Sequence, residues 1–187
     1  MRIVVGLAGS SSPIYGIRTL EALRAAGVET HLIISDGARR TLPIEARLSV
    51  EDVQALANVV YDNHDLAAAV SSGSFRTDGM IVAPCSMKTL AAIAHSYSED
   101  LLVRAADVCL KERRKLVLVP RETPLHVGHI RNMLRAAEIG AIILPPMPAF
   151  YHEPKTVDDI INQTIGKILD QFGIEHALFK RWGSPTK

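Results

Sequence analysis

The stretch that most limits the fold is KLVLV, residues 115–119. After Lys115 it shows no alternation of polar and apolar residues, which is typical of a strand covered on both faces. We therefore predict an α/β fold with a mainly parallel sheet. Ligands of such sheets bind outside the carboxyl ends of the strands. Arg121 and Glu122, which follow Pro120 at this strand's end, are therefore the first candidate site residues.

The helix predicted before this strand carries two spaced cations. Arg104 and Lys111 lie seven residues apart, which is two turns or about 10.5 Å along one helix face. One interpretation is that both cations face a bound anion. The alternative is a solvated helix end, where the helix dipole favours cations. The pattern alone does not choose between the two.

Length, charge and cysteine content restrict the class of protein. A chain of 187 residues suits one α/β domain, so we treat residues 1–187 as one domain. The net charge of +1, without a basic run interleaved with aromatics, predicts no nucleic-acid partner. Two cysteines without metal-ligand spacing fit a reducing compartment. No apolar run approaches the roughly 20 residues of a membrane span, which predicts a cytoplasmic protein without a membrane partner.

The first strand, predicted over residues 3–8, runs directly into Gly9, Ser10, Ser11 and Ser12. We expect Ser12 to cap a helix whose first residue is Pro13. Free amides, hydroxyls and the positive end of the helix dipole would meet there and could hold an anion. The alternative is a tight strand-to-helix turn without a ligand.

Two further strand ends carry similar groups. The strand over residues 29–34 ends on Ser35, which either contacts a ligand or caps the next helix. The strand over residues 80–83 leads into Ser86, Met87, Lys88 and Thr89 at the start of a helix. Cys85 has no histidine in a persuasive relation to it, so we expect a buried turn residue and not a nucleophile.

After a last strand over residues 141–144, prolines at 145, 146 and 148 hold the chain extended. They would hold Tyr151 in a fixed place, where it could line a pocket. Tyr151 could equally be a residue at the protein surface with its hydroxyl in water. We expect the tail from about residue 174 to pack on a neighbouring subunit. The histidines form no ligand pattern, so we predict no metal site.

Several motifs together resemble the UbiX/Pad family of flavin prenyltransferases, which includes proteins described as B subunits of phenolic-acid decarboxylases. They are VGLAGSSSPIYG, ISDGARRTL, SSGSF, APCSMKTL, RAADVCLKERRKLVLVPRETPL and LPPMPAFYHEP, spread over nearly the whole chain. The resemblance implies a Rossmann-like, flavodoxin-type three-layer fold and a dodecamer. It implies that a dimethylallyl group from dimethylallyl phosphate is joined to reduced FMN without a metal. The prenylated FMN would serve a UbiD-type decarboxylase.

The resemblance also implies roles for residues. FMN is expected to contact Gly9, Ser10, Ser11, Ser35, Ser86, Met87, Lys88, Thr89 and Arg104. The prenyl phosphate is expected to contact Lys111, Arg121, Glu122, Tyr151 and Lys167. Glu122 is the expected acid/base, Ser11 a relay to the leaving phosphate, and Lys111 a third catalytic residue.

This chain departs from the family pattern at two positions. Ser12 replaces a glycine and loses free access to positive φ, which predicts a changed loop or weaker flavin binding. Lys167 stands where many relatives have arginine, and it keeps the charge without the bidentate fork. Two alternatives to a prenyltransferase are an FMN-binding decarboxylase of the phosphopantothenoylcysteine type and a non-catalytic flavin carrier or accessory subunit. The decarboxylase is disfavoured because its PxMNxxMW signature is missing.

Overall fold

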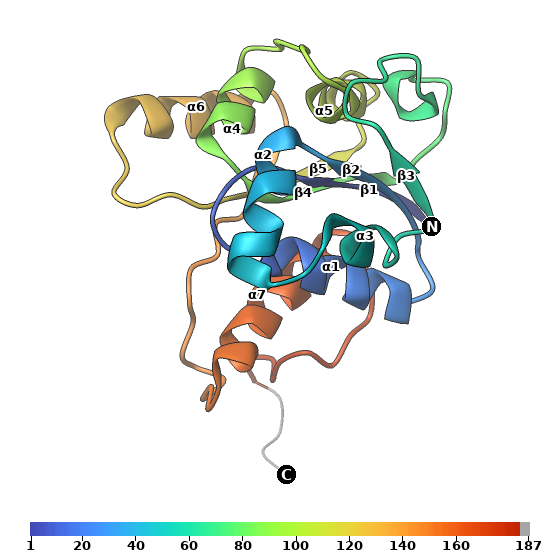
Figure 1. Cartoon of the computed structure of the whole chain (residues 1–187). Helices are drawn as coiled ribbons and strands as arrows, with labels where there is room; N and C mark the ends of the chain where they lie inside the picture. The colour runs from blue at the N-terminus through green and yellow to red at the C-terminus, as the bar shows by residue number, and fades with distance from the viewer. Residues whose placement is uncertain (184–187) are drawn as a thin grey trace.

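The computed structural model describes residues 1–183 as a six-stranded parallel sheet between two layers of helices (Figure 1). The strands are β1 Arg2–Leu7, β2 Glu29–Ile34, β3 Val59–Tyr61, β4 Gly79–Cys85, β5 Lys115–Pro120 and β6 Ile142–Ile143. All five neighbouring pairs are parallel. The predicted α/β fold with a mainly parallel sheet is therefore confirmed.

In the strand order β3-β2-β1-β4-β5-β6, the direction in which successive strands are added to the sheet reverses between β1 and β4. The chain first adds strands on one side of β1 and then crosses to the other side, which makes this pair the topological switch point. In open α/β sheets the ligand crevice forms there, at the carboxyl ends of the strands. The loops that follow β1 and β4 are therefore in position to bind a ligand.

Helices cover both faces of the sheet (Figure 1). One face carries α1 Ile14–Ala25, α3 Val50–Gln54 and α7 Val157–Gln171. The other carries α4 Met87–Ala94, α5 Leu101–Lys111 and α6 Val127–Glu138. A short helix, α2 Asp36–Thr41, continues into a π-helical turn, η1 Leu42–Ala46, and a 3₁₀ turn, η2 Ala69–Ser71, lies in the loop after β3.

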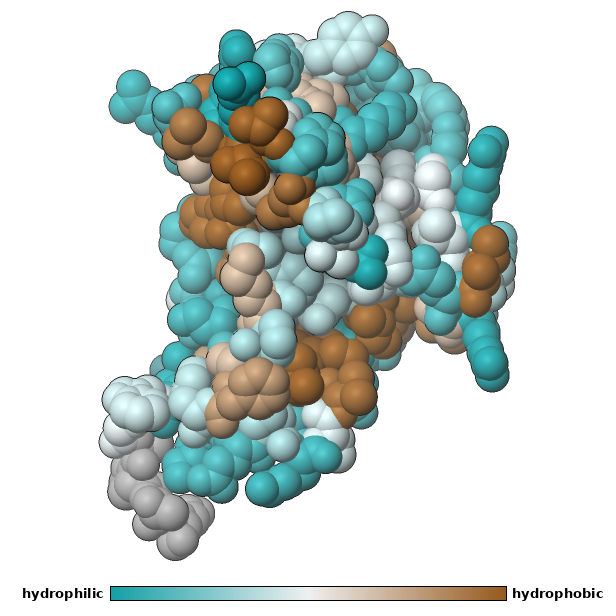
Figure 2. All heavy atoms as spheres, turned by 90° about the vertical axis from the view of Figure 1, so that its left-hand side faces the viewer, coloured by the Kyte–Doolittle hydropathy of each residue, from teal (hydrophilic) through white to brown (hydrophobic). Residues whose placement is uncertain are grey.

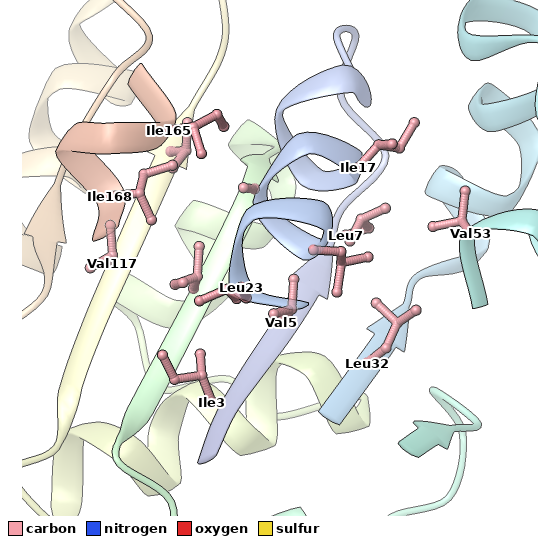
Figure 3. Close-up of a cluster of buried hydrophobic side chains, with 14 of the residues drawn as sticks. Ile3, Val5, Leu7, Ile17, Leu23, Leu32, Val53, Val117, Ile165 and Ile168 are labelled. Carbon is pink, nitrogen blue, oxygen red and sulfur yellow. The ribbon is translucent and has the colours of Figure 1, made fainter. Parts of the chain in front are cut away.

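The two apolar cores explain the missing alternation in the central strands. Val117 and Val119 of β5 pack into the core under α1 and α7, which Figure 3 shows in part. Leu116 and Leu118 pack into the core under α4 and α5. Both sets of side chains are buried on folding, so an apolar residue is favoured at every position of the strand that faces a core.

Most predicted element boundaries agree with the structure. Of the predicted helix caps, some are present and one is not. The capping boxes predicted from sequence pattern at Ser49 and Thr156 are both present. The predicted cap at Ser12 is wrong: α1 begins at Ile14, and its N-cap is Pro13 without a side-chain hydrogen bond. Ser12 has φ 73° and turns the chain into the helix instead.

The tail segment, residues 174–183, packs against α7 of its own chain through His176, Phe179 and Arg181. Contact of this segment with a neighbouring subunit stays a prediction. Within residues 1–183, no helix has both the length and the apolar character needed to cross a membrane.

Candidate functional site

A cleft of about 430 Å³ opens at the carboxyl edge of the sheet, beside the switch point. We call it the carboxyl-edge cleft. It is lined by Gly9, Ser35, Asp36, Gly37, Asn63, His64, Ser86, Met87, Lys88, Thr89, Ala92, Glu99, Asp100, Val103 and Glu122. Its volume falls within the usual range for cofactor and ligand pockets, about 300–1,000 Å³. The structure thus brings the ends of β1, β2, β4 and β5 around one space.

Backbone and hydroxyl groups make the floor of this cleft. A Cβ on Gly9 would lie 2.6 Å from the Cα of Gly37, so the two loops approach as closely as glycine allows. The Ser35 and Ser86 hydroxyls accept hydrogen bonds from the amides of Ala38 and Thr89 and so cap α2 and α4. Ser35 therefore caps a helix and also lines the cleft. Such helix starts suit a phosphate ester, and the volume and polar lining of the cleft suit the FMN that the sequence predicts.

The first loop is closed by a residue that sequence analysis missed. The Glu45 carboxylate accepts hydrogen bonds from the Ser11 hydroxyl at 2.9 Å and from the Ser12 amide at 2.8 Å. Ser12 has a positive φ of 73°, a region that glycine adopts freely. A changed loop or weaker flavin binding relative to a chain with glycine stays a prediction. Glu45 lies in an irregular π-helical turn without a motif, which is why no pattern pointed to it.

A second hollow of about 290 Å³ adjoins the cleft. It is lined by Met87, Pro120, Arg121, Glu122, Thr123, Leu125, Met133, Pro145, Pro146 and Met147. Met87 and Glu122 line both spaces, so Glu122 lies between a polar cleft and a largely apolar hollow. Its carboxylate accepts a hydrogen bond from the Thr123 amide at 3.0 Å.

Arg121 lines the second hollow and also lies near Tyr15 of α1. Burial raises the pKa of Tyr15, while a hydrogen bond with Thr164 and the charge of Arg121 act in the opposite direction, which places Arg121 near Tyr15. The Ser10 hydroxyl donates to the Arg121 carbonyl at 2.9 Å and fixes the backbone there. Within residues 1–183, Arg121 and Glu122 form no ion pair with each other or with another side chain. Pairing between them alone therefore does not explain their presence.

The structure does not bring Lys111 to this site within one chain. Lys111 ends α5 and lies beside Gly73, where it pairs with Glu112. The next strand, β5, begins at Lys115 and must cross the sheet before Arg121 is reached, a distance of about 20 Å for six residues. Within one chain, Lys111 and Arg121 therefore lie at opposite edges of the sheet, and their contact with one phosphate stays a prediction.

Arg104 also turns away from the residues that line the cleft. Its guanidinium donates to the Asp107 carboxylate at 2.7 Å and to the Ser71 carbonyl at 3.1 Å. Asp100 and Val103, four residues and one residue before Arg104, do line the cleft. Arg104 therefore lies at the border of the cleft, and its guanidinium is held by Asp107 and by the loop after β3.

Tyr151 and Lys167 belong to a group beside α7. Lys167 lies one turn after Thr164, which lies near Tyr15, and its amino group is 3.6 Å from the Asp170 carboxylate. The Tyr151 ring meets Trp182 edge to face, with centroids 5.8 Å apart. Lys167 therefore lies in the layer of α1 and α7, and Tyr151, in the turn before α7, contacts the tail segment.

The cysteines do not suit nucleophilic chemistry. Cys85 and Cys109 are both buried. Burial raises the pKa of the Cys85 thiol to about 12 and that of Cys109 to about 11. Since the thiolate is the reactive form, the prediction that Cys85 is a buried residue and not a nucleophile is supported, but Cys85 is the last residue of β4 and does not lie in a turn.

Comparison with known proteins identifies the family. The model of the Flavoprotein family matches residues 1–169. The chain is 60% identical over 182 residues to the flavin prenyltransferase UbiX of Thauera aromatica, covering 97% of this chain and 94% of that protein. It is 58% identical over 184 residues to UbiX of Escherichia coli (strain K12), covering 97% of each.

Solved structures agree. A dodecameric FMN-dependent UbiX-like decarboxylase from Escherichia coli O157:H7 matches with a TM-score of 0.95 and 52% identity over 98% of this chain and all of that one. AnUbiX in complex with FMN and dimethylallyl pyrophosphate matches with a TM-score of 0.96 and 51% identity over 99% of this chain and 98% of that one. Cysteine decarboxylases such as TvaF, at 17% identity, share the fold alone. The chain belongs to the Flavoprotein family and, within it, to the UbiX flavin prenyltransferases.

Proposed function

We propose that this chain transfers a dimethylallyl group from dimethylallyl monophosphate to reduced FMN bound in the carboxyl-edge cleft. The observation that carries the proposal is the placement of Arg121 and Glu122, unpaired within residues 1–183, beside two strand-to-helix turns suited to phosphate. A pure flavin carrier has little use for this second charged group. We further propose that the product serves a UbiD-type decarboxylase.

The cleft residues hold the acceptor. Ser86, Thr89 and the amides at the start of α4 can receive its phosphate, since a helix start offers free donors. The backbone at Gly9 lets a flat ring approach without a side chain in the way. Reduced FMN, when bound, supplies the nucleophilic ring atoms that attack the allyl carbon.

Arg121 and Lys167 bind the phosphate of the prenyl donor, with the Tyr151 hydroxyl as a further hydrogen-bond donor. Breaking the allylic C–O bond leaves negative charge on the departing phosphate. Cations already in place stabilise this charge without reorganising, which is the most effective form of electrostatic catalysis. Arg121 is suited to the task because no carboxylate within residues 1–183 neutralises it.

Glu122 serves as the acid/base that removes a proton after alkylation. It lies where the cleft meets the apolar hollow, so it is the carboxylate common to both spaces. Ser11 relays a proton to the leaving phosphate. Its hydroxyl is oriented by Glu45, which is a second carboxylate close to the first loop.

A second copy supplies Lys111 and completes the site. Lys111 lies at the opposite edge of the sheet from Arg121, yet its cation is half exposed and available to a neighbour. The outer face of α6 carries an apolar stripe that suits burial between copies: Val127, Ile130 and Leu134 are 61%, 53% and 59% exposed. Figure 2 shows apolar side chains gathered on the upper part of this side of the molecule, where α6 lies. We propose a homo-oligomer, with a dodecamer as the expected form.

Mass spectrometry of the flavin tests the proposal. Wild-type protein incubated anaerobically with reduced FMN and dimethylallyl phosphate should yield FMN enlarged by one prenyl unit. A parallel sample with dimethylallyl pyrophosphate should react more slowly. Glu122→Gln should still bind FMN and form the product about 10²- to 10⁴-fold more slowly, the usual cost of losing a positioned acid/base. If wild type returns only unmodified FMN, the carrier alternative replaces the proposal.

A further inference from the structure

Asp170, near the end of α7, gathers three partners from separate positions. Its carboxylate receives both arms of the Arg181 guanidinium, at 2.6 and 3.1 Å. His176 lies 3.2 Å away, and Lys167 lies 3.6 Å away. Only 19% of the Asp170 side chain is exposed, whereas Lys167 and Arg181 are about half exposed. One carboxylate thus holds two cations whose outer sides remain open to solvent.

The hydrogen bonds fix the state of His176. Its Nδ1 accepts a hydrogen bond from the Leu178 amide at 3.2 Å, so the proton of the neutral ring lies on Nε2. Nε2 then donates to Asp170. The tail segment is therefore attached to Asp170 at two points five residues apart, His176 and Arg181.

Packing at Gly166 shows that the tail segment is closely fitted to α7. A Cβ at Gly166 would lie 2.5 Å from the nearest ring carbons of both His176 and Phe179. Arg181 in turn lies over the Phe179 ring, 5.5 Å from its centroid. Only glycine permits this approach, so the tail segment occupies a built position on the helix.

The attached tail segment places aromatic and charged groups next to the residues proposed to bind the donor. Trp182 meets the Tyr151 ring. Tyr151, Lys180, Arg181, Trp182 and Gly183 together line a surface hollow. Among residues 1–183, the cations Lys167, Lys180 and Arg181 outnumber the Asp170 carboxylate at this place, which leaves an excess of positive charge suited to a phosphate ester.

We infer that Asp170 is a positioning residue for the donor-phosphate site: by holding Arg181 and His176 it keeps the tail segment on α7 and Trp182 against Tyr151. This inference rests on the proposed function, since it concerns how that site is held together. Asp170 itself contacts no substrate. Without it, Arg181 and Trp182 leave the site, while the carboxyl-edge cleft, formed by other residues, is unchanged.

The tests are Asp170→Asn and Arg181→Gln, with Glu175→Gln as the control, because Glu175 is an exposed carboxylate of the same segment. Both test variants should raise the donor KM about tenfold, equivalent to losing one charge-assisted hydrogen bond. FMN affinity and kcat at saturating donor should stay within about twofold. The donor KM of the double variant should be no higher than that of either single variant, because the two residues act as a pair. The donor KM of Arg181→Lys should lie between the wild-type value and that of Arg181→Gln, since lysine keeps the charge but loses the two-armed hydrogen bonding of the guanidinium.

Trp182 offers a readout that is independent of catalysis, because it is the only tryptophan in the chain. Its fluorescence anisotropy should fall in Asp170→Asn and Arg181→Gln and stay at the wild-type value in Glu175→Gln. If wild type forms the prenylated flavin and both test variants keep the wild-type KM and anisotropy, the inference is wrong although the proposed function stands. If wild type forms no product, the proposed function fails, and the anisotropy alone then decides whether Asp170 holds the tail segment. Circular dichroism checks folding, and Arg181→Gln changes only a half-exposed side chain.

Discussion

Replacing Ser12 by glycine should stabilise the protein. Ser12 has φ 73°, a left-handed conformation that costs a residue with a Cβ about 1–2 kcal/mol. Glycine removes this cost but loses about 0.5–1 kcal/mol through its greater freedom in the unfolded chain. The hydrogen bond from the residue 12 amide to Glu45 does not depend on the side chain and is retained. The difference is a gain of about 0.75 kcal/mol at the centre of these ranges, and of about 1.5 kcal/mol at most.

Urea unfolding at fixed protomer concentration measures this gain, since an oligomer's apparent stability depends on concentration. The midpoint should rise without a change in m-value, and the Tm should rise by about 1–4 °C for a chain of this size. Ser12→Ala is the matched control: it removes the hydroxyl and keeps the Cβ, so its stability should match wild type within about 0.5 kcal/mol. A Ser12→Gly protein that is less stable than wild type would show that the loop does not hold residue 12 in the left-handed region.

Two other predictions concern the cysteines and the surface of α6. Burial raises the pKa of the Cys85 thiol to about 12, so this thiol stays protonated at neutral pH. Iodoacetamide should therefore label Cys85 at pH 8 only as fast as the protein unfolds. Rapid labelling of the native protein would contradict the burial of Cys85. Ile130→Glu with Leu134→Glu, which places charge on the exposed apolar stripe, should give smaller assemblies by light scattering, whereas Arg131→Gln on the same helix should assemble as wild type. Unchanged assembly of the double variant would place the subunit contacts elsewhere.

The sheet could be predicted from sequence because burial on both faces leaves a pattern that lies within each strand. KLVLV needs no distant information to be recognised as a covered parallel strand. The same holds for the capping boxes at Ser49 and Thr156, which involve residues three positions apart. The hydroxyls at Ser35 and Ser86 likewise follow their strands directly.

The features that the sequence did not predict depend on contacts between residues far apart in the chain, which a local pattern does not contain. Helical spacing put Arg104 and Lys111 on one helix face but gave no information on which sheet edge Lys111 would reach. Glu45 contacts Ser11 across 34 residues from an irregular turn, so its role could only be found in three dimensions. The attachment of Arg181 to Asp170 likewise depends on how the tail segment folds back on α7.

Subunit complementation tests whether the prenyl-transfer site joins strand-end residues of one copy with Lys111 of another. Lys111→Gln and Glu122→Gln, expressed separately, should each be nearly inactive. Co-expressed with different tags and purified through both, they should form mixed assemblies in which about one quarter of the sites combine a wild-type Lys111 with a wild-type Glu122. If the site is shared, the mixture should form prenylated FMN at about that fraction of the wild-type rate. A mixture as inactive as either single variant would show that Lys111 and Glu122 do not act together across a subunit contact.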